Sequence, residues 1–259
     1  MLDVRIGDRD KAGEFADEFV RNKTDVIFVG GPMFAGVKAQ AGATPIVFVM
    51  SGDPVETKWV ATLARPGAIV TGFTSLALEL EGKRLELLKE IAPRITRVAV
   101  LANALHPGYS SQLVAAQAAA KKLGLSLQIV PVRAPGDFDA AYEAMTREGA
   151  EAIHTFPDGL IHRQAKLIAE YAARRRIPSV GGWLLYVEAG NLLSYGPNEQ
   201  EFYRRAAAYV DRILRGAKPA DLPVELPTRF ESMVNKTTAK ALGLTLPTSI
   251  LLRAEKVIE

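Results

Sequence analysis

Short apolar runs alternate with helical segments along almost the whole of this 259-residue chain, and this alternation restricts the fold more than any other feature. Runs such as Ile46–Met50 are continuously apolar, so both faces of each strand are expected to be buried. Segments such as KAGEFADEFVRN and LALELEGKRLELLKEIA instead repeat their apolar residues at helical spacing. Buried strands that alternate with helices are typical of parallel sheets covered on both faces, so the sequence predicts an α/β fold.

The number of apolar runs indicates two sheets rather than one. Strands are expected at residues 4–6, 26–29, 46–50, 69–73, 98–101, 126–130, 152–156, 179–180 and 192–195. Pro93 ends a long helix shortly before a new strand opens, and the division between two lobes is expected there. We therefore predict two doubly wound, Rossmann-like lobes with parallel sheets, formed by residues 1–95 plus 194–226 and residues 96–193 plus 227–259.

Composition excludes several classes of protein. The chain has no cysteine, which excludes a disulfide framework, a cysteine-ligated zinc site and a thiol nucleophile. The net charge is only +3, and the basic cluster Arg174–Arg176 fits a solvated helix end, so no nucleic-acid partner is expected. No apolar run approaches the roughly 20 residues of a membrane helix. The three histidines fit no metal motif, and no nucleotide-binding glycine motif is present, so neither a metal nor a cofactor is expected.

Glycine-containing or polar loops follow several of the expected strands. Ligands of open α/β sheets bind at the carboxyl ends of strands, so these loops are the candidate binding site. Glycines before a helix allow either a plain turn or the binding of a carboxylate by free N–H groups. The candidate ligand-binding residues are Gly30, Gly31, Pro32, Ser51, Gly52, Asp53, Asn103, His106, Asp158, Trp183 and Tyr195.

The two candidate carboxylates admit more than one interpretation. Asp53 either caps a helix around residues 57–63, binds a ligand amine or hydroxyl, or acts as a general base. Asp158 occupies the matching loop of the second lobe and is favoured as a ligand contact. Trp183 and Tyr195 either sandwich a flat or apolar part of a ligand or pack near a hinge. His154, inside an expected strand, is interpreted as a core or lining histidine.

Several blocks, in the same order, resemble one protein family. The segment GDPVETKWVATLARPGAIVTGFTSLALELEGKRLELLKEIAPRITRVAVLAN is similar to ABC-transporter substrate-binding proteins of the tryptophan/tyrosine type. Later blocks with the same resemblance are FPDGL, VEAGNLLSYGPN, RRAAAYVDRILRGAKPADLPVELPTRFE and NKTTAKALGLTLP. The resemblance implies a type I periplasmic-binding-protein fold that holds a small solute between its lobes. It also implies a non-enzymatic role, in which an amino acid, aromatic or branched, is delivered by open–closed hinge motion to an ABC permease of the inner membrane.

The resemblance also implies a location and a departure from the family pattern. Members usually begin with a secretion or lipoprotein signal, a first strand and a first helix, which this sequence is expected to lack. The full-length form is expected in the periplasm or lipid-anchored outside the inner membrane. An unpaired strand edge in the shortened lobe would allow a homodimer.

Two other function classes remain open at this point. The same two-lobed core serves as the ligand-sensing effector domain of transcription regulators, although no DNA-binding helix pair is evident here. An α/β enzyme is the third class, but the sequence offers no G-x-S-x-G elbow or other nucleophile constellation.

Overall fold

The structure, a computed structural model, describes residues 9–75 and 78–259. Contacts within the chain divide it into two compact units, and each unit is assembled from two separate stretches of sequence. Unit 1 comprises residues 1–76 and 199–227, and unit 2 comprises residues 77–198 and 228–259.

The first boundary between the units differs from the predicted one at residue 95. Helix α3 (Glu79–Ile91) belongs to unit 2, because it packs on helix α4 (Tyr109–Leu123) and on strands β7 (Ser179–Gly181) and β8 (Leu193–Pro197). The proline after α3 therefore marks the end of a helix but not the end of a unit.

Unit 1 is built on a parallel sheet in the order β1-β2-β3. In this sheet Ile46 pairs with Ile27 on one side and with Val70 on the other. The elements are η1 (Arg9–Lys11), α1 (Ala12–Arg21), β1 (Ile27–Gly30), η2 (Gly31–Met33), α2 (Phe34–Gln40), β2 (Ile46–Met50), β3 (Val70–Thr74), α9 (Glu199–Leu214) and η4 (Pro219–Asp221).

The central strand of unit 1 explains why its sequence is continuously apolar. Phe48 lies in a cluster with Phe34 of α2, on the face that α1 and α2 cover. Val47 points to the other face, where it packs with Phe202 and Tyr209 of α9. Burial of both faces in β2 agrees with the prediction from its apolar run.

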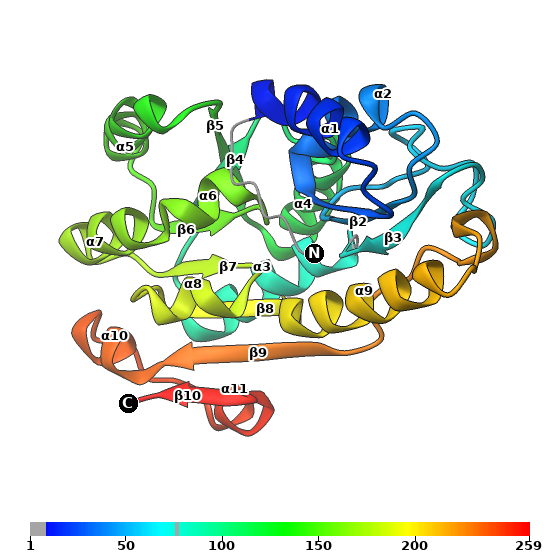
Figure 1. The fold of residues 1–259 in the computed structure, drawn as a ribbon. Helices are drawn as coiled ribbons and strands as arrows, with labels where there is room; N and C mark the ends of the chain where they lie inside the picture. The colour runs from blue at the N-terminus through cyan, green and yellow to red at the C-terminus, as the bar shows by residue number, and fades with distance from the viewer. Residues whose placement is uncertain (1–8, 76–77) are drawn as a thin grey trace. The chain divides into compact units, whose positions relative to one another are not determined.

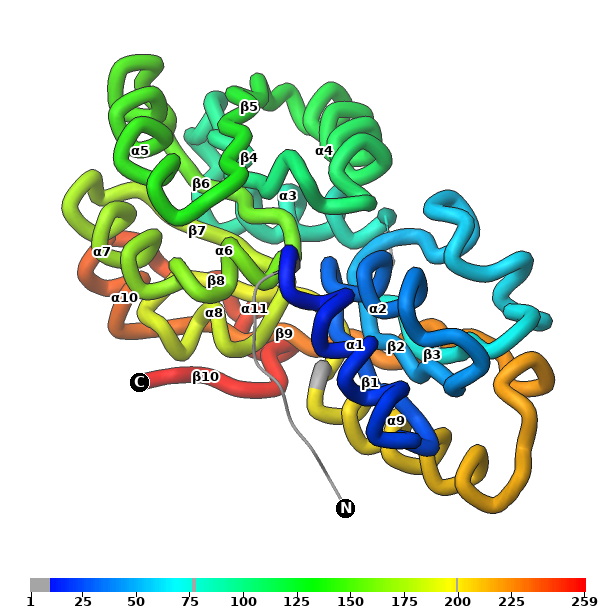
Figure 2. The backbone as a smooth tube through the Cα atoms, turned by 45° about the horizontal axis from the view of Figure 1, so that its top comes forward, coloured from blue at the N-terminus to red at the C-terminus, as the bar shows by residue number. Residues whose placement is uncertain are grey.

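Unit 2 contains a seven-stranded sheet in the order β10-β9-β8-β7-β6-β4-β5. Figure 2 shows β5 and β10 at opposite edges of this sheet. The remaining elements are β4 (Arg97–Asn103), β5 (Ser126–Val132), η3 (Pro135–Asp137), α5 (Phe138–Arg147), β6 (Ala152–Thr155), α6 (Gly159–Arg163), α7 (Ala165–Arg175), α8 (Leu184–Glu188), β9 (Phe230–Asn235), α10 (Lys236–Ala241), α11 (Thr248–Arg253) and β10 (Lys256–Ile258).

Strand β4 shows how two helical layers enclose the sheet of unit 2. Val98 and Val100 pack with residues of α3, α4, α10 and α11. Ala99 and Leu101 face the opposite layer, made of α5, α6, α7 and Tyr186 of α8. The α/β architecture predicted from the alternating runs is confirmed (Figure 1).

Two features of the sheets differ from the predictions. Strand β9 pairs antiparallel with β8, so the sheet of unit 2 is mixed at this edge rather than wholly parallel. The predicted strand at residues 4–6 lies outside the described residues. Across residues 9–75 and 78–259, no helix combines the length and the apolar character that crossing a membrane requires.

Candidate functional site

Asp158 and Asn103 meet at the carboxyl ends of two neighbouring strands of unit 2. Asn103 ends β4 and Asp158 follows β6, and the Asn103 amide donates a hydrogen bond to Asp158 Oδ1 at 3.1 Å. The backbone N–H of Leu160 donates to the same oxygen at 2.7 Å, so Asp158 is the N-cap of α6. Asn103 is itself oriented, because its side-chain oxygen accepts from the N–H of Leu105 at 2.9 Å.

The charge of Asp158 is buried without a cationic partner among the described residues. Asp158 is only 3% exposed, and the two hydrogen bonds that its carboxylate accepts from described residues both end on Oδ1. Burial lowers the pKa of the His106 imidazole and so favours its neutral form, although the charges of Asp158 and Glu81 act in the opposite direction. A buried carboxylate is costly unless it is paired, so this site is suited to a ligand that brings a positive group.

An aromatic pair is formed between helix α6, which follows β6, and the loop after β7. Trp183 is the N-cap residue of α8 and is half-buried. Its ring centroid lies 5.4 Å from that of His162 in α6, and the two ring planes meet at 65°. Unit 2 thus carries a carboxylate and an indole in loops that leave the same edge of its sheet.

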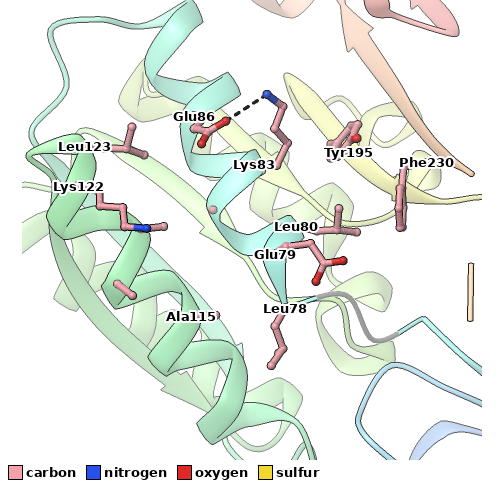
Figure 3. A pocket seen from close by; sticks show the side chains of 13 residues that line it. Leu78, Glu79, Leu80, Lys83, Glu86, Ala115, Lys122, Leu123, Tyr195 and Phe230 are labelled. Carbon is pink, nitrogen blue, oxygen red and sulfur yellow. Dashed lines mark hydrogen bonds and ion pairs between the residues drawn. The ribbon is translucent and has the colours of Figure 1, made fainter. Parts of the chain in front are cut away.

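Tyr195 lies on a different part of unit 2. Its ring tilts against Phe230 at a centroid distance of 6.2 Å. Both residues line an open depression of about 590 Å³ against helices α3 and α4 (Figure 3). The structure therefore does not place the Tyr195 ring in the loops that carry Asp158 and Trp183.

In unit 1, Asp53 caps a turn and not the helix that the sequence predicted. Its Oδ1 accepts from the N–H groups of Val55 at 2.7 Å and Glu56 at 3.2 Å. Residues 57–63 form turns and bends, so the predicted helix is wrong. Neighbouring Gly52 is buried, and its carbonyl accepts from the Thr74 hydroxyl at 2.6 Å. Asp53 thus caps a turn in place of the predicted helix, and ligand contact by Ser51, Gly52 and Asp53 stays a prediction.

The loop at Gly30, Gly31 and Pro32 also follows a strand of unit 1. Gly30 ends β1, and the next three residues form the short helix η2. Gly31 has φ +55°, a conformation that disfavours other residues and explains the glycine. No side chain would be crowded at either glycine, because a Cβ added there meets no atom within 4 Å.

A buried ion cluster, formed by Glu81, Arg84 and His154, was missed by sequence reasoning. Arg84 Nη1 contacts Glu81 Oε1 at 2.7 Å, and His154 Nε2 lies 2.7 Å from Glu81 Oε2. Arg84 Nε also donates to the carbonyl of Tyr195 at 2.8 Å. Burial favours the protonated acid, but the charge of Arg84 and the hydrogen bonds from His154 and Arg84 hold the pKa of Glu81 below its ordinary value. The cluster joins α3 to β6 and β8.

Comparison with known proteins places this geometry in a class of binding proteins. A crystal structure of a conserved domain protein from Vibrio cholerae O1 biovar El Tor is 28% identical, with a TM-score of 0.89 over 97% of this chain and 84% of that chain. A Streptococcus pneumoniae ABC domain in complex with L-Trp is 25% identical, with a TM-score of 0.89 over 97% of this chain and 87% of that one. The fold is that of the type I periplasmic binding proteins, as predicted.

The sequence matches identify the family. Residues 5–258 match the family described as ABC transporter substrate binding protein, and the chain belongs to this family. A tyrosine-binding protein of Clostridioides difficile is 25% identical over 230 residues, which are 88% of this chain. The chain spans 66% of the length of that relative. The resemblance inferred from the sequence blocks is therefore confirmed.

Proposed function

We propose that this chain is the solute-binding component of an ABC importer and that its solute is an aromatic amino acid. The observation that carries the proposal is the buried carboxylate of Asp158, which is oriented by two hydrogen bonds to one oxygen and has no cation beside it in the part of the chain that the structure describes. An α-amino group would supply the missing positive charge. Trp183, in the next loop, offers an apolar face for an aromatic side chain.

The family relatives support the choice of ligand class. One relative is known as a tyrosine-binding protein, and a structural relative of 25% identity holds L-Trp. In this proposal the protein works in the periplasm and passes its ligand to a membrane permease. Members of the family are substrate-binding proteins, and no catalytic step is assigned to any residue here. The predicted hinge motion stays a prediction.

Replacing Asp158 by asparagine tests the proposal. Asp158→Asn keeps an oxygen that can accept from the N–H of Leu160, but it removes the charge. A hydrogen bond to a charged group contributes about 1.5–3 kcal/mol, so the affinity for L-tyrosine or L-tryptophan should fall about 10- to 100-fold in isothermal titration calorimetry.

Asp137→Asn is the matched control for this substitution. Asp137 also accepts two backbone N–H groups, from Arg133 at 2.6 Å and Ala134 at 3.1 Å, but it is only half-buried and lies in η3, which follows the edge strand β5. Its replacement should leave the affinity unchanged. Equal affinities of Asp158→Asn and the wild type would remove Asp158 from the site, and wild-type protein that binds no aromatic amino acid would refute the function.

A further inference from the structure

His162 connects the two loops that form the candidate site in unit 2. Its backbone N–H donates to the carbonyl of Asp158 at 2.9 Å, so the histidine lies one turn along α6 from the capping carboxylate. The side-chain ring of His162 contacts Trp183 edge to face, with ring centroids 5.4 Å apart. A single helical turn therefore links the position of the carboxylate to the position of the indole.

The imidazole of His162 is held there by packing more than by hydrogen bonding. Its Nδ1 is buried and has no hydrogen-bond partner among the described residues. Burial lowers the pKa of His162, and the positive charge of Arg163 lowers it further, so both favour the neutral ring. A buried polar atom without a partner is uncommon and calls for an explanation. The ring instead packs edge to face against Trp183.

We propose that His162 is a positioning residue that fixes the indole of Trp183 for stacking on the side chain of the ligand, and that it thereby makes the site prefer aromatic over branched amino acids. This inference rests on the proposed function and deepens it. Asp158 would hold the amino group of either class of ligand. Only an aromatic side chain gains from an indole whose orientation is fixed, because stacking depends on the angle between the rings.

Two substitutions of His162 separate the ring contact from general packing. His162→Ala removes the ring, whereas His162→Phe keeps a ring edge against Trp183 and has no polar atom to bury. The affinities for L-tyrosine and L-leucine are measured by isothermal titration calorimetry. We expect His162→Ala to weaken L-tyrosine binding about three- to tenfold and L-leucine binding by less than about twofold. His162→Phe should restore tyrosine binding to within about twofold of the wild type.

The chain offers a matched control for loss of an aromatic pair. Tyr142 of α5 meets Phe138 at a centroid distance of 6.1 Å and an angle of 62°, close to the geometry of the His162–Trp183 pair. Tyr142 lies on α5 and not in the loops that carry Asp158 and Trp183, and its ring also stacks on Tyr171 of α7 at a centroid distance of 4.5 Å. Tyr142→Ala should therefore lower the melting temperature without changing the preference for tyrosine over leucine.

A spectroscopic measurement reports on the indole directly, without ligand. The chain has two tryptophans, so Trp59→Phe leaves Trp183 as the single indole. Fluorescence anisotropy of Trp183 should fall when His162→Ala is added to this background, because the ring becomes more mobile. It should recover with His162→Phe. A merely structural role for His162 would lower the melting temperature and leave both the anisotropy and the ligand preference unchanged.

The outcomes distinguish this inference from the proposed function. Wild-type protein that binds neither tyrosine nor tryptophan refutes the proposed function, and this inference with it. If the wild type binds tyrosine and His162→Ala binds it equally well, or loses tyrosine and leucine to the same extent, the inference about His162 is overturned and the function stands.

Discussion

Removal of Arg84 should destabilise unit 2 far more than removal of the lysine beside it. The Arg84 side chain is 2% exposed and bonds both to Glu81 and to the carbonyl of Tyr195. Arg84→Met fills similar space but leaves the Glu81 carboxylate buried beside His154 alone. Breaking a buried ion pair by removing one partner costs about 3–5 kcal/mol, which is a large share of the typical stability of a domain.

The adjacent residue supplies the control. Lys83 forms an ion pair with Glu86 at 3.1 Å, and their side chains are 38% and 53% exposed. Exposed pairs contribute about 0.2–1 kcal/mol, so Lys83→Met should have little effect. The free energies of unfolding are measured by urea denaturation followed by circular dichroism, at constant pH.

A double variant tests the physical reason for the loss. Glu81→Gln combined with Arg84→Met removes both charges, and replacing a whole buried pair by neutral side chains is often close to neutral. The double variant should therefore be more stable than Arg84→Met alone. The reasoning is refuted if Arg84→Met costs no more than Lys83→Met, or if the double variant is the least stable of the series.

Two further predictions concern packing and pH. Gly72→Ala in β3 should lower the free energy of unfolding by about 3 kcal/mol or more, because the new Cβ would lie 2.1 Å from the carbonyl oxygen of Phe48. Gly136→Ala is the control and should be nearly neutral, because a Cβ added there meets no atom within 4 Å. Urea unfolding compares the two variants. The pKa of Glu81 is lowered from 4.5 in the folded state, so its contribution to stability is present above that pH and is lost as the pH falls through the folded value. Glu81→Gln should accordingly be less stable than the wild type at neutral pH and should flatten the loss of stability below pH 4.5, and an unchanged acid limb in thermal melts would contradict this.

The strands of the core were predictable because they satisfy a local rule. Ile46–Met50 is continuously apolar and bounded by turn residues, and β2 has these limits in the structure. Strand β9 (Phe230–Asn235) was not predicted, because polar residues interrupt its apolar ones. It pairs antiparallel with β8. Residues 57–63 have apolar residues at helical spacing but form turns and bends. In these turns Trp59 stacks on Phe34.

The candidate site was predictable in its position and less so in its details. The rule that ligands meet the carboxyl ends of strands selected Asn103 and Asp158, which the structure brings to 3.1 Å. The buried ion cluster left no local signal, because Glu81 and Arg84 look like an ordinary i,i+3 pair on a solvated helix face. Glu81 bonds to His154, which lies 73 residues away from it in the sequence. Contacts of this kind are set by the tertiary fold.

The division of unit 1 into two stretches of sequence has a consequence during synthesis. Val47 and Phe73 lie on the sheet face that α9 covers, but α9 leaves the ribosome only after residues 78–198 have been made. At about 5–20 residues per second, synthesis from residue 78 to the end of α9 at residue 214 takes roughly 7–27 s. During that interval the apolar face of the unit 1 sheet is not yet covered by α9. Newly made chains should therefore depend on holding chaperones until residue 214 has emerged.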